Sequence, residues 1–537
     1  MLAENAWTRP ALWRFVSADF GVADLAQLPD SALARVEEVP VPVQGRPPRA
    51  WGTGETVPVT TGARVDAAAL CAAFRSGATT PTAVLERLLD RQTAGDFGAA
   101  THSPFVALDP EGARQAAAQS TERWAAGAPR GPLDGVPVPV KDEYDMRGLP
   151  TRGGSAWRTD PVGEDAVLVA RLRAGGAVLP GKAHAAENGM NPLGFNPHFD
   201  YPRNVYSAAH GAGGSSTGSA VAVGLGMAPV AVSSDGGGSI RLPASLNGLF
   251  GLKPGLNRMS RTGDIWLGTV GHPGPIGASV SDLVALLEVC AARDPLDAFT
   301  HFPPDWDSVV PTWRAALGRG IQGCVIGVLR GEFVDAEPEI ARGCEAALKA
   351  LEAEGATLVD VDIAHLAIVN AIGPLVIAGE SAANAQEDLR DHRGAFGDEL
   401  RLVYGMMRAV NAQTHLRAQR ARTGLRQRAA AALCGVDLLA LPTHLRLAAP
   451  HPASESRQPV SDTAWTAAFT RPSFLANLTG LPAGTAPVGM SGGLPFGLQL
   501  LGDAWDEASV IAGLAHLERM AVSDIPLPPS YRPLTET

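Results

Sequence analysis

Two serines set among glycines are the residues of this 537-residue chain best suited to chemistry. Ser215 follows a glycine pair, and Ser239 follows the run at 236–238. Glycine lets the backbone approach a ligand closely and present its N–H groups, at an entropic cost. A serine beside such groups is a candidate nucleophile next to an anion site. The alternative is a pair of flexible Gly/Ser linkers, but residues 220–232 between the serines are apolar enough to be buried.

Amide hydrolysis needs a nucleophile, donors to the oxyanion and a proton for the leaving nitrogen. Ser239 offers the nucleophile, and the backbone N–H groups just before it predict an oxyanion hole. The predicted donors are Gly236, Gly237 and Gly238. The base stays open at this point, because no histidine except His210 lies near either serine. Lys141 ends an alternating run of valines over 136–140 and is expected to point away from their face.

The segment 211–254 resembles the signature of the amidase signature family. It contains a GGSS-type turn, an apolar span, a D-x-GGS-I-R-x-P motif and a G-L-K-P close. Four further segments resemble family blocks in the right order, so that the likeness covers roughly residues 65–520: 135–155, 181–190, 271–289 and 478–502. The chain is therefore identified as a member of this family. Gly236 departs from the family pattern, which more often has threonine or isoleucine there, and indicates a looser oxyanion loop or a wider acyl pocket.

The resemblance implies a Ser–Ser–Lys triad that works through an acyl-enzyme. Ser239 would be the nucleophile, Ser215 the bridging serine on a cis peptide bond, and Lys141 the base. An ordinary lysine has a pKa near ~10.4, so few lysines are uncharged at neutral pH. Burial without a counter-charge favours the uncharged form. We therefore expect Lys141 to lie in a dry pocket, unpaired with the carboxylates of Asp142 and Glu143.

Three neighbours are expected to support this site. Asp235 and Arg241 flank the second glycine run and are predicted to pair and hold the loop. Ser216 is interpreted as a hydrogen-bonding neighbour and not as a second nucleophile.

The predicted function is hydrolysis of a non-peptide amide, linear or cyclic. An esterase or carbamate hydrolase with the same triad is a first alternative, because the same acyl-enzyme cycle cleaves weaker acyl bonds. A glutamyl-tRNA amidotransferase A-type subunit is a second. The acidic charge and the N-terminal extension weigh against the second alternative, and the lack of a visible anchor weighs against a fatty-acid-type member.

Several other motifs are interpreted as unrelated to function. Residues 214–218 fit the nucleophile elbow G-x-S-x-G, which requires a buried strand before it, whereas 201–213 is polar. Residues 176–183 nearly fit a P-loop but lack the magnesium-binding hydroxyl. His184 and Glu187 have metal-like spacing without a second histidine, so neither a metal nor a cofactor is predicted. The arginines at 417–428 indicate a solvated helix face and not an RNA site.

Composition favours a soluble enzyme. The formal net charge of −11 argues against nucleic acid as a partner, and five widely spaced cysteines fit reduced thiols in the cytoplasm. The sequence shows neither a signal peptide nor an uninterrupted apolar run near ~18 residues, so no membrane span is predicted. The expected partner is a small-molecule amide substrate, with a homodimer as the default assembly.

The resemblance to the amidase signature family implies an α/β protein with the amidase-signature fold, a large mixed β-sheet core covered by helices on both faces. Residues 1–60 form an N-terminal extension with a Pro-rich connector, 61–525 the amidase signature domain, and 526–537 a tail. The extension is expected to dock as an arm, because so short a piece cannot bury a core alone.

Local patterns predict individual elements within the domain. A helix is expected from Asp66 to Gly77, and a second one starts with Thr80 as N-cap and Pro81 as first residue. A strand–helix–strand unit is expected over 324–361, with parallel strands.

Overall fold

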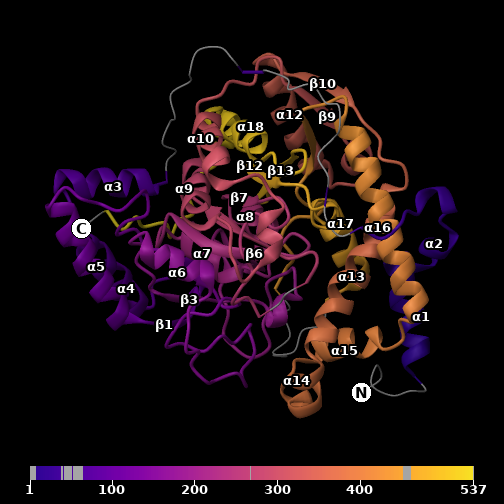
Figure 1. Cartoon of the computed structure of the whole chain (residues 1–537), viewed down its shortest axis with the longest axis horizontal. Coiled ribbons are helices and arrows are strands. Elements are labelled where there is room, and N and C mark those ends of the chain that lie inside the picture. Colours follow the sequence, from indigo (N-terminus) through magenta and orange to yellow (C-terminus); the bar gives the residue numbers. More distant parts are fainter. Residues whose placement is uncertain are drawn as a thin grey trace.

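A mixed β-sheet forms the centre of the protein. The computed structural model describes residues 8–37, 40, 51–52, 64–265, 268–451 and 461–535. Eleven strands are ordered β1-β3-β2-β6-β8-β7-β12-β13-β11-β9-β10, and helices surround the sheet (Figure 1). The predicted α/β architecture is confirmed, whereas most of the predicted Pro-rich connector lies outside the described residues.

The sheet combines parallel and antiparallel pairs. Strand β2 is parallel to β3 and to β6, and β9 is parallel to β10 and β11; the other pairs are antiparallel. Strands β4 and β5 form a separate hairpin. The strands are β1 Phe105–Leu108, β2 Val140–Lys141, β3 Gly181–Ala183, β4 Arg203–Asn204, β5 Ser207–Gly211, β6 Val230–Asp235, β7 Phe250–Lys253, β8 His272–Gly277, β9 Val325–Val328, β10 Thr357–Asp360, β11 Leu438–Pro442, β12 Ala483–Ser491 and β13 Leu494–Leu501.

The helices fill the connections between strands and build a separate helical region around α13 to α17. They are α1 Arg9–Asp19, α2 Val22–Gln27, α3 Ala67–Ser76, α4 Pro81–Ala94, α5 Pro110–Ala125, α6 Val167–Ala174, α7 Thr217–Gly224, α8 Arg241–Leu246, α9 Val280–Cys290, α10 Trp306–Leu317, α11 Arg330–Val334, α12 Pro338–Ala353, α13 Val369–Asn384, α14 Gln386–Asp391, α15 Asp398–Met407, α16 Ala412–Leu433, α17 Thr463–Thr479 and α18 Glu507–Arg519.

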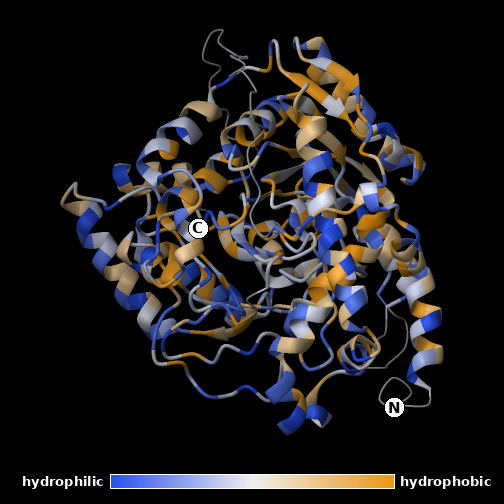
Figure 2. Cartoon of the chain, turned by 45° about the vertical axis from the view of Figure 1, so that its right-hand side comes forward, coloured by the Kyte–Doolittle hydropathy of each residue, from blue (hydrophilic) through white to orange (hydrophobic). Residues whose placement is uncertain are grey.

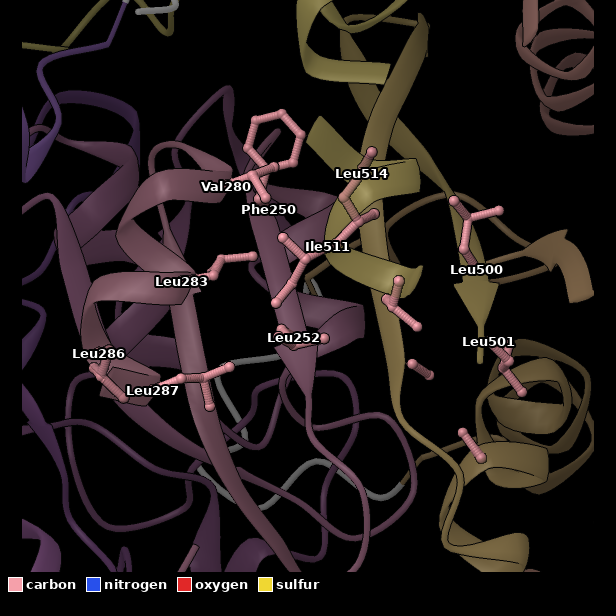
Figure 3. Close-up of a cluster of buried hydrophobic side chains, with 14 of the residues drawn as sticks. Phe250, Leu252, Val280, Leu283, Leu286, Leu287, Leu500, Leu501, Ile511 and Leu514 are labelled. Atoms are coloured by element: carbon pink, nitrogen blue, oxygen red, sulfur yellow. The ribbon is translucent and has the colours of Figure 1, made fainter. Parts of the chain in front are cut away.

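Two side chains on opposite faces of β13 show that helices cover both faces of the sheet. Phe496 packs against α12, where a Cβ added to Gly343 would lie 2.3 Å from its ring. Gln499 points to the other face, because successive strand residues alternate, and accepts a hydrogen bond from Arg241 of α8 at 2.8 Å. On the α12 side, Leu283 of α9 and Ile511 of α18 lie around strand β7 (Figure 3). Burial of one such side chain contributes about 1.5–3 kcal/mol.

The two helices predicted at the start of the domain are confirmed. Asp66 caps α3 by accepting from the Ala69 N–H, and Gly77 ends it in the left-handed region. Thr80 caps α4, with Pro81 at its first position. Local cap chemistry predicted these boundaries, because each signal acts within one helical turn.

The predicted strand–helix–strand unit is confirmed as β9–α12–β10. The two strands are parallel, as a crossover helix requires. One face of α12 is buried and includes Ile340, Cys344, Leu348 and Leu351.

The arginine-rich helix α16 corrects one prediction, because its arginines do not form a solvated face. Arg422 and Arg426 are buried, and both donate to the carbonyl of Leu478, at 2.9 and 3.1 Å. Arg417 donates to the carbonyls of Leu25 at 2.7 Å and Leu28 at 2.6 Å, at the end of α2. The guanidinium groups bind backbone carbonyls in the last turn of α17 and at the end of α2, which have no partner within their own helix. Helices α1 and α2 accordingly lie beside α13, α15, α16 and α17 (Figure 1).

The described residues contain one helix that is long and apolar enough to cross a membrane. It runs from Leu366 to Asn384, with a mean hydropathy of 1.6, and half of it is buried inside the protein. It includes α13, which packs against α16 and α17. Hydrophobic residues also alternate with hydrophilic ones along the outer helices (Figure 2). The apolar character of α13 is therefore explained by its packing, and by the cavity described below.

Candidate active site

Strand β2 places Lys141 inside the protein. Val140 pairs with Lys182 of β3 on one side and with Val232 of β6 on the other, and the valines at 136, 138 and 140 are buried. The Lys141 side chain is 0% exposed. A residue at the end of a central strand thus points into the interior beside β6.

The Lys141 amine has three close oxygen neighbours. Its Nζ lies 2.7 Å from Ser215 Oγ, 2.8 Å from Ser234 Oγ and 3.0 Å from Glu143 Oε2. The amine is thus hydrogen-bonded to two hydroxyls and paired with a carboxylate. Burial of Lys141 matches the expectation, but the prediction of an unpaired lysine is wrong.

Glu143 and Ser234 are site residues that the sequence reading missed. The chain turns just after β2, where the N–H of Glu143 donates to the Lys141 carbonyl at 2.7 Å, and this turn returns the carboxylate to the amine. Ser234 lies on β6 and donates to Glu143 Oε2 at 2.5 Å. The only sequence signal was the i, i+2 spacing of Lys141 and Glu143, which places two side chains on one side of an extended segment.

Ser215 lies at the turn that leads into α7. The peptide bond between Gly214 and Ser215 is cis. A Cβ at Gly214 would lie 2.3 Å from the carbonyl oxygen of Asn191, so this position accommodates only glycine. Ser216 donates to the Ser234 carbonyl at 3.2 Å, which fits its predicted place as a hydrogen-bonding neighbour.

Ser239 lies in the loop between β6 and α8, and the predicted Asp235–Arg241 pair holds this loop. Arg241 Nε lies 3.0 Å from Asp235 Oδ2, and both side chains are 0% exposed. Burial by itself would raise the pKa of Asp235, but Arg241 and the surrounding donors hold that pKa below its ordinary value. The ionised carboxylate therefore fixes the backbone on either side of Ser239.

The three glycines of the predicted oxyanion hole do not have the same surroundings. The Gly238 N–H donates to Asp235 Oδ1 at 2.6 Å, so this donor is directed at the carboxylate and not at a substrate. Gly238 also has a φ of +122°, which favours glycine. A Cβ at Gly237 would lie 2.5 Å from the Phe474 ring. Gly236 and Gly237 line the cavities next to Ser239.

Two cavities meet at Ser239. The first, here called the polar cavity, has a volume of about 60 Å³ and includes Ser215, Ser234 and Glu143 in its lining. The second, here called the apolar cavity, has a volume of about 150 Å³ and is lined mainly by α1, α13, α15 and α17. Gly189, Met190, Ser239 and Ile377 line both cavities.

Comparison with known protein families identifies the family of this chain. The family model described as Amidase matches residues 84–511, which is well over half of the chain. This protein belongs to the amidase signature family.

The relatives of this amidase-family chain are named for different reactions and substrates. It is 34% identical over 468 residues to the A-type subunit of the glutamyl-tRNA(Gln) amidotransferase of Chloroflexus aurantiacus, covering 82% of this chain and 93% of that protein. It is 32% identical to a fatty acid amide hydrolase of Oryza sativa subsp. indica, covering 86% and 76%. The crystal structure of a peptide amidase with the competitive inhibitor chymostatin matches with a TM-score of 0.74 and 28% identity, covering 87% of this chain and 99% of that one.

The P-loop-like, metal-like and G-x-S-x-G motifs of this amidase-family chain have structural and not catalytic explanations. The P-loop-like segment ends in strand β3. Burial lowers the pKa of His184 to about 4, and Glu187 bonds instead to His198 at 2.7 Å. Within the described ranges, no three His, Cys, Asp or Glu side chains are placed to hold a metal ion. The serine of the G-x-S-x-G segment follows β5, which is half-exposed, and not a buried strand.

Proposed function

We propose that this protein hydrolyses a non-peptide amide through Ser239, Ser215 and Lys141. The observation that carries the proposal is the 2.7 Å contact of Lys141 Nζ with Ser215 Oγ, beside a cavity that Ser239 also lines. A base, a bridging hydroxyl and a second hydroxyl thus adjoin one space, as acyl transfer requires.

The first half of the reaction forms an acyl-enzyme. Unprotonated Lys141 accepts the proton of Ser215, which accepts that of Ser239 as its Oγ attacks the carbonyl carbon. The N–H groups of Gly236 and Gly237 stabilise the oxyanion, and one such donor typically contributes about 3–4 kcal/mol. The C–N bond then breaks, and Ser215 returns a proton to the leaving nitrogen while Lys141 reprotonates Ser215.

The second half repeats the proton transfers with water. Water adds to the acyl carbon and gives its proton through Ser215 to Lys141. The Ser239 ester bond then breaks, Ser239 regains its proton, and the carboxylic acid leaves. Because the cycle requires an unprotonated Lys141, we expect the rate to rise toward alkaline pH.

The size of the polar cavity supports a small-molecule substrate. At about 60 Å³ it accommodates a small leaving amine better than the remainder of a peptide chain. The relatives named as amidases of several kinds agree with a C–N hydrolase, and they leave the acyl group open.

Substitution of each triad member tests the proposal. Ser239→Ala and Lys141→Ala should each lower kcat by roughly 10⁴-fold or more, and Ser215→Ala somewhat less, because nucleophile and base act as one unit. The measurement is kcat and KM on a panel of aliphatic, aryl and cyclic amides with matched esters and carbamates. Ser308→Ala, an exposed serine on α10, is the control. Near-normal amide turnover by Ser239→Ala would overturn the mechanism, and turnover of the esters or carbamates alone would favour that alternative.

A second candidate function is that of a catalytic component in a tRNA-dependent amidotransferase. The 34% identity to the A-type subunit of a glutamyl-tRNA(Gln) amidotransferase favours it. The purified single chain separates the two candidates. Amide hydrolysis without a partner and no gel shift of tRNA support the hydrolase, whereas activity that appears only with partner proteins supports the amidotransferase.

A further inference from the structure

We infer that the apolar cavity is the acyl site, that the N-terminal helix α1 forms one of its walls, and that the substrates are amides of bulky apolar acids with a small leaving amine. This inference rests on the proposed function. It adds the substrate class and a specificity element that lies before residue 84, where the family match begins.

The position of Ser215 decides which cavity takes which half of the substrate. In the proposed cycle Ser215 hands its proton to the leaving nitrogen, so that nitrogen must lie on the Ser215 side of Ser239. Ser215 lines the polar cavity and is not among the residues of the apolar one. The leaving amine therefore occupies the polar cavity, and the acyl group extends from Ser239 into the apolar cavity.

The polar cavity suits ammonia or a small amine. Its volume is about 60 Å³, and its lining includes Glu143, Asp264 and Glu380. Carboxylates next to a nascent amine stabilise its protonated form and disfavour an anionic leaving group. A primary amide, which releases ammonia, fits this space.

The apolar cavity suits a ring or a chain of about six carbons. An apolar cavity of about 150 Å³ has the volume that binds benzene in a protein interior, and this one has about 150 Å³. Its lining includes Met190, Met406 and Met407, and flexible methionine side chains adapt to ligands of irregular shape. Gly236 has no side chain to narrow the passage between the two cavities, where a Cβ would lie 2.8 Å from Ile377 Cδ1.

Helix α1 forms part of the wall of this cavity. Trp13, Val16, Ser17 and Phe20 face it, and Val16 packs with Met406 of α15 in a small cluster. Phe15 on the same helix is 70% exposed and does not line the cavity. The helix thus has one face toward the acyl site and another toward solvent, which provides a matched pair of positions for a test.

A substrate series tests the acyl site on the full chain. The kcat/KM values are compared for acetamide, hexanamide, phenylacetamide and acetanilide. Each added methylene that is buried is worth about fourfold in binding, so hexanamide, with its longer chain, should exceed acetamide by about 250-fold. Acetanilide, with a small acyl group and a bulky leaving amine, should be no better than acetamide.

Variants on α1 test the wall. Trp13→Ala should lower the hexanamide-to-acetamide ratio about tenfold, and Phe15→Ala should leave the ratio unchanged. Because Trp13→Ala removes packing and can unfold the arm, Ser17→Phe is the second variant. It adds a ring from a half-exposed position and should lower kcat/KM for phenylacetamide about tenfold relative to acetamide.

The outcomes separate this inference from the proposed function. Equal kcat/KM for acetamide and hexanamide, or a preference for acetanilide, overturns the inference while amide hydrolysis stands. A normal ratio in both folded α1 variants overturns the role of the helix. Failure of the wild type to cleave any amide overturns both, because the acyl site has meaning only with the nucleophile.

Discussion

At the scale of single residues, Lys141, the proposed base, is paired with a carboxylate. Glu143 lies 3.0 Å from the Lys141 amine, and Ser234 contacts both groups. These contacts fix the position of the Lys141 amine next to Ser215 Oγ, which lies 2.7 Å away.

We predict that Glu143→Gln lowers kcat about tenfold or more, because the amide loses the charge-assisted contact that positions the Lys141 amine beside Ser215. Glutamine keeps the size of the side chain and an acceptor for Ser234. The measurement is kcat for the best amide of the panel. Glu86→Gln, in an exposed pair with Arg114, should leave kcat unchanged. An unchanged kcat in Glu143→Gln would contradict the assigned influence of Glu143.

At the scale of elements, helix α16 fastens the N-terminal arm to the domain. Its arginines donate to carbonyls of the arm, including those of Leu25, Ala32 and Ala34. Each such bond pairs a charged donor with a backbone acceptor at the end of a short element. The wall of the apolar cavity is thus positioned by a helix about 400 residues further along the chain.

We predict that Arg417→Ala loosens the arm and speeds its limited proteolysis by at least about tenfold. The variant removes two close hydrogen bonds to the end of α2, and bonds to charged groups contribute about 1.5–3 kcal/mol each. Cleavage of a transiently open segment follows its open population. Mass spectrometry of the early fragments should place the first cuts in residues 9–37. Among the described residues, the Arg420 side chain makes one hydrogen bond to the arm, of 3.3 Å. Arg420→Ala should therefore have a smaller effect, and equal rates for the two variants would contradict this docking.

At the scale of the whole molecule, buried carboxyl groups make stability depend on pH. Burial raises the pKa of Glu518 to about 8, although its carboxyl accepts a hydrogen bond from the Val280 N–H at 3.1 Å. An unfolded glutamate has a pKa near ~4.3. Between these values the folded protein binds the proton more tightly, so the stabilisation is complete below pH ~4.3 and is lost as pH rises to about 8.

We predict that Glu518→Gln removes this loss, because the amide keeps the acceptor and never ionises. The free energy of unfolding of the variant relative to wild type should rise with pH by at most ~1.4 kcal/mol per unit between ~4.3 and 8. Urea unfolding at several pH values in that window gives the difference. A difference that does not change with pH would show that Glu518 ionises normally in the folded protein.

A cytoplasmic location and a homodimer stay predictions from the sequence.

The sequence alone determined the family, the sheet-and-helix class and several element boundaries. The helix caps at Asp66 and Thr80 depend on contacts within one helical turn, and the buried face of α12 depends on the spacing of its apolar residues. Both signals are present in the linear sequence. The two serines and Lys141 could be identified for a related reason: the glycines before the serines and the valines before Lys141 are neighbours in the sequence.

Only the tertiary structure decided the surroundings of those residues. The pairing of Lys141 with Glu143 and Ser234 depends on a turn after β2 and on the neighbouring strand β6. Arg422 and Arg426 of α16 are buried because the end of α17, distant in sequence, packs against them. The apolar cavity is built from helices spread between residues 9 and 479. Burial and electrostatic pairing depend on which distant segments meet in space, and a linear pattern does not contain that information.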